Sequence, residues 1–364
     1  KPFVKGGKEG MRLQVFNTSD YTPIWKNDLV LETPSERNPV QEIAVNNEGV
    51  AYVFKDLQND LKERLFHIFT VDGSKVKRHE IALTDLNRGQ FKVQVDYNGN
   101  LIAAGTLAPK GKPSNNSNGY FFIKVDTSGE ILSQRLQMFE PETLTGIVNP
   151  RSIEKGGFFF SELNLNDIVL KSDGGVILLG EIQRNSKVQA GQALPPIIEH
   201  TLYFSNVLVL SLDQTGNRMW STVVEKEQMV KTLDPRKHFG SFAHHIVDDK
   251  LMIVWNYTNF LMDPPLNKFR YWVDRTGAKI NLDNLFGKDA LYPTMLTIID
   301  QKGNFEHSNF TFNAFPLVDI QKPNAFTMAV APAISIGTPN GLVVLSHMPV
   351  QNILRYKYNY IKIK

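Results

Sequence analysis

Histidine and a few acids are the side chains of this sequence that could carry acid–base or metal chemistry. The chain has 8 His, and His244 and His245 are adjacent in an apolar segment, where strand alternation would send their rings to opposite faces. The sequence contains no His-Glu-x-x-His pattern and no other pair of histidines at the spacing of zinc ligands. Glu42, Glu162 and Asp167 are the acids that could lie on an inner strand, but their spacing gives no sign that they converge. We therefore assign no catalytic residue, no metal site and no cofactor.

Aromatic clusters outside the predicted turns are the residues that could serve recognition instead. They comprise Phe158, Phe159 and Phe160, then Tyr203 and Phe204, and then Phe260, Tyr271 and Trp272. Contiguous exposed apolar side chains mark protein interfaces. The alternative is that these clusters fold back and cover the edges of sheets. We predict that they form an interface for a protein partner.

The composition narrows the classes of partner and of chemistry. The chain has 364 residues with 40 Lys and Arg against 37 Asp and Glu, so a net charge of +3 gives no electrostatic case for nucleic acid as a partner. The absence of cysteine excludes disulfides, thiolate metal sites and cysteine nucleophiles. No apolar run reaches the roughly 18 residues that a membrane-spanning helix needs. A chain without an initial Met and without cysteine fits an exported protein and also a cytosolic one. We expect a periplasmic or extracellular location.

The elements that must position these residues follow from a repeated hairpin pattern. A short apolar run meets a turn of the Asp/Asn-x-x-Gly kind, and a second apolar run leaves it. Asp and Asn accept backbone hydrogen bonds in such turns, Gly supplies a positive φ, and the β-branched and aromatic flanks suit strands. One kind of hairpin has its turns at 46–49, 96–99 and 172–175, with weaker copies at 248–249 and 339–341. A second kind follows each first one, with turns at 72–73, 126–129, 213–216 and 300–303.

Two hairpins make a four-stranded sheet, so the repeats predict an all-β fold. Four such sheets follow in sequence, and a fifth would combine strands from both ends of the chain. This is how a β-propeller closes its ring. We predict one propeller domain over residues 1–364, with five four-stranded blades. The surplus segments 269–273 and 353–363 could together make a sixth blade, and that alternative stays open.

The connections are unequal in length, and this suggests which face carries function. The turns within hairpins are tight, whereas the other connections are long and would lie together on the opposite face of a propeller. We predict long loops at 106–119, 140–163, 183–205, 225–240, 259–292 and 314–325. Long loops on a rigid scaffold usually carry recognition.

The segment 211–220, with Asp213, Thr215, Gly216 and Trp220, carries the most specific local pattern. It resembles the Asp-x-x-Thr-Gly-x-x-x-Trp docking motif of quinoprotein-type propellers, one residue short, and the Asp-box of sialidase-like propellers, one residue long. Both motifs are structural in their families, so the resemblance implies a propeller and neither a quinone cofactor nor sialidase activity. The Asn-, Lys- and Phe-rich, cysteine-free composition resembles exported propellers of Bacteroidetes-type bacteria. Some of these accompany outer-membrane machinery, including the plug of the type IX secretion translocon.

Together these features predict a non-enzymatic propeller that binds another protein through its long-loop face. Such a protein would be an accessory or plug-like subunit of a cell-envelope or secretion complex, and its partner could be embedded in the membrane. The alternative is a propeller enzyme acting on carbohydrate, a glycosidase or a lyase. A third interpretation is a carbohydrate-binding module that uses loop aromatics.

Overall fold

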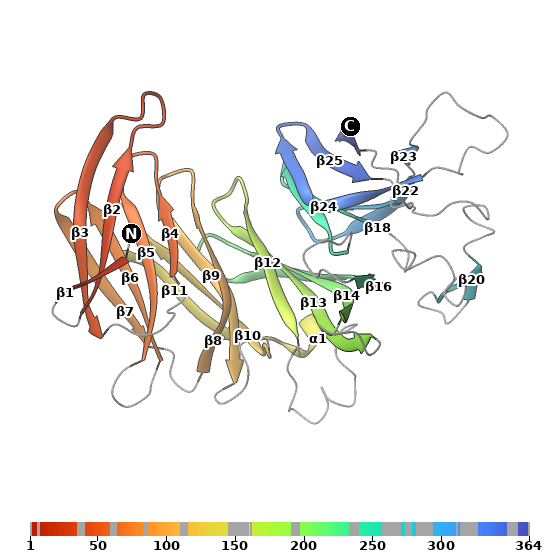
Figure 1. The fold of residues 1–364 in the computed structure, drawn as a ribbon, viewed down its shortest axis with the longest axis horizontal. Helices are drawn as coiled ribbons and strands as arrows, with labels where there is room; N and C mark the ends of the chain where they lie inside the picture. The colour runs from red at the N-terminus through yellow and green to blue at the C-terminus, as the bar shows by residue number, and fades with distance from the viewer. Residues whose placement is uncertain are drawn as a thin grey trace. The chain divides into compact units, whose positions relative to one another are not determined.

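The structure is a computed structural model of the 364-residue chain. It describes residues 2–5, 8–34, 41–58, 64–82, 86–109, 116–144, 160, 162–190, 197–232, 240–256, 271–273, 279–281, 294–310, 312–313, 327–347 and 356–362. The chain forms two compact units (Figure 1). The first comprises Lys1–Ser161, Leu165–Leu178 and Ser211–Met219, and the second comprises Glu162–Asn164, Leu179–Leu210 and Trp220–Lys364. That these units form one domain stays a prediction.

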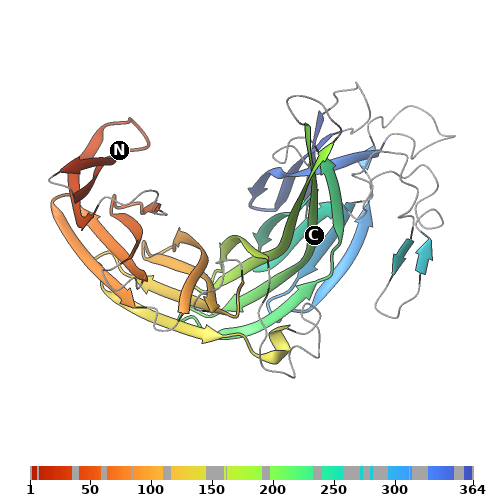
Figure 2. The ribbon, with the colours of Figure 1, turned by 60° about the horizontal axis from the view of Figure 1, so that its bottom comes forward.

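The fold is all-β and is built from antiparallel sheets, as predicted (Figure 2). A three-stranded sheet has the order β1 (Pro2–Lys5), β2 (Lys8–Phe16), β3 (Pro23–Pro34). Two four-stranded sheets follow, with β4 (Gln41–Val45), β5 (Ala51–Gln58), β6 (Arg64–Asp72) and β7 (Lys75–Ala82), and then β8 (Leu86–Val95), β9 (Leu101–Pro109), β10 (Gly119–Val125) and β11 (Ile131–Met138). A short helix, α1, spans Pro141–Leu144.

The later sheets follow the same plan with one addition. A sheet of β12 (Leu163–Leu170), β13 (Val176–Ala190), β14 (Ile197–Leu212) and β15 (Arg218–Val224) gains β16 (Gln228–Thr232), which pairs with β14. The next has the order β17 (Ala243–Val247), β18 (Lys250–Asn256), β21 (Thr294–Ile299), β22 (Phe305–Phe310). Two further sheets hold β19 (Tyr271–Val273) with β20 (Lys279–Asn281), and β23 (Phe312–Asn313), β24 (Thr327–Thr338), β25 (Gly341–His347) and β26 (Tyr356–Lys362).

The ends of the chain differ in part from the sequence prediction. Among the described residues, β1–β3 pair with one another and β23–β26 pair with one another, and no pairing joins the two sets. Closure of a ring and the number of blades therefore stay predictions. The suggested sixth blade, made from 269–273 with 353–363, is wrong as a grouping, because β26 pairs with β25 whereas β19 pairs with β20.

The loop prediction at 183–205 is also wrong for most of its length. β13 continues to Ala190, and β14 begins at Ile197, so these two strands run on well beyond the other strands of their sheet. The segment at 225–240 contains β16, which pairs with β14 from His200↔Thr232 to Phe204↔Gln228. What the sequence suggested as two loops is in large part a sheet extension.

Most hairpin turns form as predicted, with a positive φ at the glycine that ends the turn, for example +81° at Gly99 and +85° at Gly216. The turn predicted at 172–175 is displaced by one residue, because Gly174 has the positive φ and its amide donates to the carbonyl of Lys171. The weaker copy at Asp248 and Asp249 turns without glycine, with φ of 49° and 57° at the two aspartates. Asn and Asp tolerate this left-handed region better than other side-chain-bearing residues.

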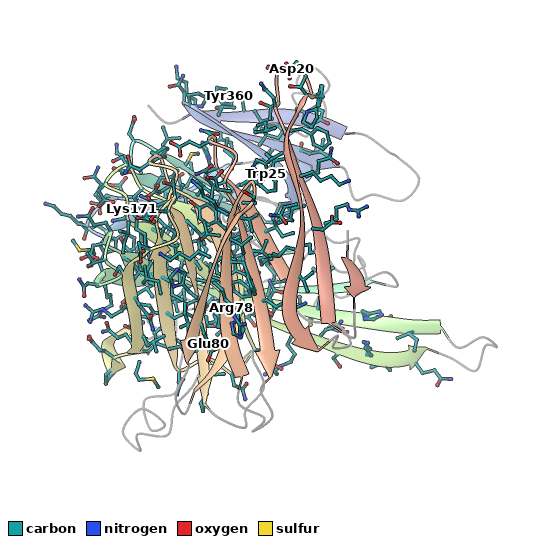
Figure 3. All side chains as sticks on the ribbon, turned by 90° about the vertical axis from the view of Figure 1, so that its left-hand side faces the viewer. Asp20, Trp25, Arg78, Glu80, Lys171 and Tyr360 are labelled. Atoms are coloured by element: carbon teal, nitrogen blue, oxygen red, sulfur yellow. The ribbon has the colours of Figure 1, made fainter. Side chains whose placement is uncertain are left out.

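Apolar side chains pack between consecutive sheets within each unit. In the first unit, one core lies between the β4–β7 and β8–β11 sheets, where Phe66 contacts Phe91 edge to face with ring centroids 5.1 Å apart. Another lies between the β1–β3 and β4–β7 sheets, beside Trp25 on β3, which donates from Nε1 to the carbonyl of Gly49 at 2.9 Å (Figure 3). In the second unit, Met252 and Val254 pack against Leu342 and Val344.

A repeated hydrogen bond also fastens consecutive sheets together. In each case, a side chain on the last strand of one sheet bonds a carbonyl in the turn of the second hairpin of the next sheet. The pairs are Asn27 with Gly73 at 2.6 Å, His79 with Gly129, Ser133 with Thr215 at 2.8 Å, and Trp220 with Gln301 at 2.7 Å. The turn ends of these sheets are therefore held by their neighbours.

Candidate functional site

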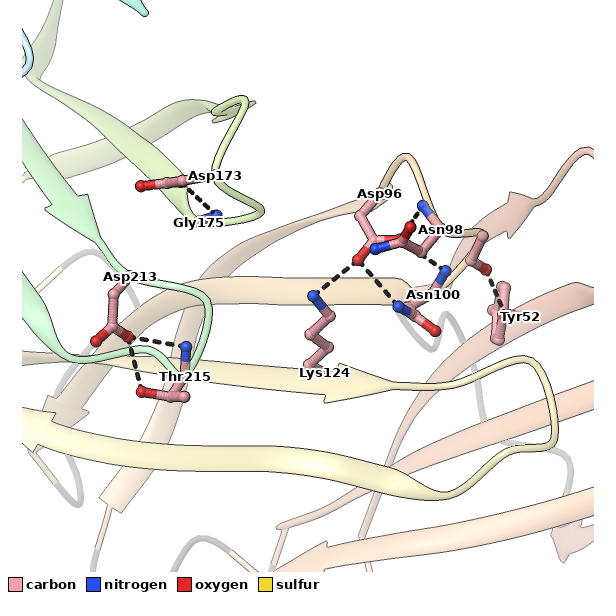
Figure 4. Close-up of polar contacts among 10 residues, drawn as sticks. Tyr52, Asp96, Asn98, Asn100, Lys124, Asp173, Gly175, Asp213 and Thr215 are labelled. Carbon is pink, nitrogen blue, oxygen red and sulfur yellow. Dashed lines mark hydrogen bonds and ion pairs between the residues drawn. The ribbon is translucent and has the colours of Figure 1, made fainter.

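The acidic side chains of the hairpin turns stabilise the turns through hydrogen bonds. Asp213 Oδ1 accepts hydrogen bonds from the Thr215 amide and hydroxyl, both at 2.8 Å (Figure 4). Oδ1 also accepts from the Asn217 amide at 2.9 Å, and Oδ2 accepts from Asn217 Nδ2. Burial alone would raise the pKa of Asp213, but these hydrogen bonds outweigh it and lower the pKa to about 2. A carboxylate so fully engaged stabilises its turn and is a poor proton acceptor.

Asp96 has a similar role and also carries a buried ion pair. Its Oδ2 lies 2.8 Å from Lys124 Nζ, and both side chains are almost fully buried (Figure 4). Burial opposes ionisation of Asp96, but the bonds from Lys124 and Asn100 overcome it and lower the pKa of the carboxyl. Tyr52 donates to the Gly99 carbonyl of the same turn at 2.9 Å. This polar cluster of the first unit joins two sheets and has a structural explanation.

The acids and histidines singled out from the sequence do not form a shared centre in what the structure describes. Glu42 lies on β4, Asp167 Oδ1 accepts from the Ile168 amide at 2.8 Å, and Glu162 pairs with Arg184 at 2.8 Å. His245 Nε2 lies 2.8 Å from the Thr338 carbonyl, across to the neighbouring sheet. Over the described ranges, no group of three or more His, Asp or Glu side chains could hold a metal ion.

The predicted aromatic interface is corrected at two positions. Phe160 is buried and contacts Phe139 edge to face at 5.2 Å, and Phe204 is buried with Leu202 and Val230. Both rings therefore belong to the core and cannot anchor a partner. Tyr203, by contrast, is 39% exposed, because strand alternation turns it away from its buried neighbour.

The remaining predicted interface residues are not tested. Phe158, Phe159 and Phe260 lie outside the described residues. Tyr271 and Trp272 lie on β19, but their side chains are outside what the structure describes. Their part in an interface stays a prediction.

Tyr203 lies on the sheet extension noted above, which we call the arm. The arm comprises residues 183–190 of β13, residues 197–205 of β14, and β16, all in the second unit (Figure 1). It exposes apolar side chains besides Tyr203, namely Val188 at 58% and Ile198 at 42%, of which Ile198 lies on the opposite face of β14 from Tyr203 by strand alternation. Exposed apolar and aromatic groups on a regular, paired element are suited to contact another protein, since little ordering of the backbone remains to be done on binding.

A buried ion pair fixes the base of the arm. Glu181 on β13 and Lys226, just before β16, contact each other through Oε1 and Nζ, and neither side chain has any exposed surface. The other oxygen, Glu181 Oε2, accepts from Ser241 Oγ at 2.6 Å and from Gln183 Nε2 at 2.7 Å. Burial lowers the pKa of Lys226, and Glu181 opposes that effect. The cation also lies 5.5 Å from the ring centroid of Phe204.

A second set of bonds ties the same base to the following sheet. Gln228 Nε2 donates to the carbonyl of Asn256, the last residue of β18, at 2.7 Å, and its Oε1 accepts from the Ser241 amide at 2.9 Å. Ser241 has a φ of +71°, a conformation that side-chain-bearing residues seldom adopt. The network holds it there. The arm is thus anchored to its own sheet and to β18.

Comparisons with known proteins add little to this geometry. No protein-family model matches the chain, and no curated protein sequence is significantly similar to it. Among the solved structures, a protein of unknown function from Bacteroides caccae shares 12% identity over 84% of this chain and 92% of that chain, with a TM-score of 0.26. An exo-1,5-alpha-L-arabinanase from a bovine ruminal metagenomic library shares 9% identity over 84% and 95%, with a TM-score of 0.28. A GH43_1 enzyme from Xanthomonas citri complexed with xylotriose shares 10% identity over 88% and 85%, with a TM-score of 0.29. These scores are too low to assign a fold or an activity to this chain.

Within the described ranges, no helix combines the length and the apolarity that crossing a bilayer requires.

Proposed function

We propose that the protein is a non-enzymatic β-propeller that binds another protein, as an accessory or plug-like subunit of a complex at the cell envelope. The observation that carries the binding proposal is the arm. It exposes Val188, Ile198 and Tyr203, and a fully buried ion pair fixes its base. Exposed tyrosine on a rigid support is typical of binding surfaces. The periplasmic or extracellular location is part of the same proposal.

The propeller part of the proposal rests on the repetition of the sheets. Successive antiparallel sheets pack face to face within each unit and share the same turn-to-strand hydrogen bond. We propose that the ends of the chain complete a ring. Because the chain has no cysteine, dyes placed on Thr18→Cys and Tyr358→Cys would report the distance between the first and last sheets. A closed ring predicts efficient energy transfer that urea abolishes, and weak transfer in the native protein would contradict closure.

Affinity capture from an envelope extract of the source organism tests the binding proposal. We expect the wild-type protein to retain one partner in a fixed ratio, and Tyr203→Ser combined with Ile198→Ser to lower its recovery at least tenfold. Tyr97→Ser is the matched control, because Tyr97 is also an exposed tyrosine but lies in a turn of the first unit. Equal recovery with the arm variant would contradict the proposal.

A parallel experiment with the same variants tests the carbohydrate alternative. Binding to a glycan array, or release of reducing sugar from plant polysaccharides, would support that alternative if it occurred without any captured protein. We expect no cleavage at the arm, since cleavage of a glycosidic bond needs a pair of carboxyl groups and Glu199 is the one acid among the arm's residues.

A further inference from the structure

Strand β11 is an edge strand with an apolar exposed face. It is the outermost strand of its sheet, whose order is β11-β10-β9-β8. Leu132, Leu136 and Met138 are 54%, 36% and 45% exposed, and Gln134 between them is exposed as well. These positions alternate along the strand and so share one face. The result is an apolar stripe beside a strand edge that no other described strand covers.

The opposite face of β11 is already used by the fold. Ser133 donates to the Thr215 carbonyl at 2.8 Å, Arg135 bonds Asn217, and Gln137 accepts from Tyr120 at 3.0 Å. These contacts fix the strand in its place, so the apolar stripe cannot turn inward. The stripe is a stable surface of the folded first unit.

Charge protects the corresponding edge strand of the preceding sheet, which is a common device at exposed strand edges. The outermost strand of the preceding sheet, β7, exposes Lys75, Arg78 and Glu80, of which the last two are labelled in Figure 3. A charged edge strand of that kind resists pairing with a second chain. The exposed face of β11, formed by residues 132, 134, 136 and 138, has no charged side chain, and Gln134 is its one polar residue.

The sequence of β11 is complementary to itself in one antiparallel register. If Gln134 lies opposite Gln134 of a second copy, Leu132 lies opposite Leu136 on both sides of the two-fold axis, and Ser133 lies opposite Arg135. In the neighbouring register, centred on Arg135, two guanidinium groups would face each other, which is unfavourable. We propose that two copies of this chain dimerise by antiparallel pairing of β11 in the register centred on Gln134. The partner is a second copy because this register buries leucine against leucine and brings no like charges together.

A single introduced cysteine tests this register directly, because the chain has none of its own. In the proposed dimer, residue 134 lies opposite itself with Cβ atoms roughly 4.5–5.5 Å apart, near the range that a disulfide bridges. We expect Gln134→Cys to form a covalent dimer under mild oxidation, which reduction reverses. Met138→Cys is the control, because Met138 is exposed on the same face but would lie opposite Glu130. Equal cross-linking of both variants, or none of Gln134→Cys, would overturn the proposal.

Sedimentation velocity gives an independent measurement without cysteine. We expect the wild-type protein to sediment as a dimer at micromolar concentration and Leu136→Lys to sediment as a monomer with an unchanged circular dichroism spectrum. Val76→Lys, a matched substitution at an exposed position of β7, should remain dimeric. A monomeric wild-type protein would refute the proposal and leave the arm's proposed role untouched, since the arm belongs to the other unit.

Discussion

Replacing Lys226 with methionine would leave the Glu181 carboxylate without its cation at a site where neither side chain has any exposed surface. Breaking a buried ion pair by removing one partner typically costs 3–5 kcal/mol of stability, because an uncompensated charge remains in the interior. Ser241 and Gln183 still donate to Glu181 at 2.6 and 2.7 Å, so we expect the low end, about 3 kcal/mol. For a unit of this size, that corresponds to a fall of roughly 6–12 °C in Tm.

The assay is urea unfolding followed by circular dichroism and tryptophan fluorescence on four proteins: wild type, Lys226→Met, Glu181→Leu and the double variant. The double variant removes both charges, so it should recover much of the loss that either single change causes. Glu181→Leu should be milder than Lys226→Met, because burial lowers the pKa of Lys226 and so reduces the cost of neutralising it when Glu181 is absent. If Lys226→Met changed the free energy of unfolding by less than about 0.5 kcal/mol, the ion pair would not anchor the arm.

Two further predictions concern the turns. Gly303→Ala should cost about 1–2 kcal/mol more than Gly73→Ala in thermal unfolding, since both glycines have a positive φ but only at Gly303 would the new Cβ meet Trp220, at 2.8 Å; equal losses would show that Trp220 does not pack there. The first unit should lose stability as the pH falls below about 4. The folded-state pKa values of Asp96 and Asp213 are depressed, to about 2 for Asp213, so their stabilisation is complete above the unfolded value of 3.8 and disappears as the pH falls through the folded one. Asp213 alone should account for roughly 2 kcal/mol, and an Asp213→Asn variant with the same acid sensitivity would contradict this.

Local chemistry made the hairpins predictable from sequence. At Asp96 and Gly99, or Asp213 and Gly216, the acceptor and the positive-φ residue are three positions apart, so the turn is encoded in one short segment. The apolar runs on either side of each turn then identify strands from the local sequence alone. All-β antiparallel sheets followed from these segments alone.

Contacts between distant segments were not predictable in the same way. Glu181 and Lys226 are 45 residues apart, and neither occurs in a motif. The sequence predicts loops in place of the arm, because the arm's strands carry polar residues such as Asn185 and Ser186 and lack the apolar pattern that identifies a buried strand. Phe160 and Phe204 were predicted at a surface because an aromatic residue in a long connection has no local signal that distinguishes an anchor from a core residue.

The most direct test of the binding proposal is a photo-reactive phenylalanine analogue incorporated at position 203, with the same analogue at position 97 as the control. After irradiation in native envelope extract, mass spectrometry should identify one protein cross-linked at position 203 and absent at position 97. No adduct at position 203, or the same proteins at both positions, would contradict the claim that the arm of this protein holds a protein partner.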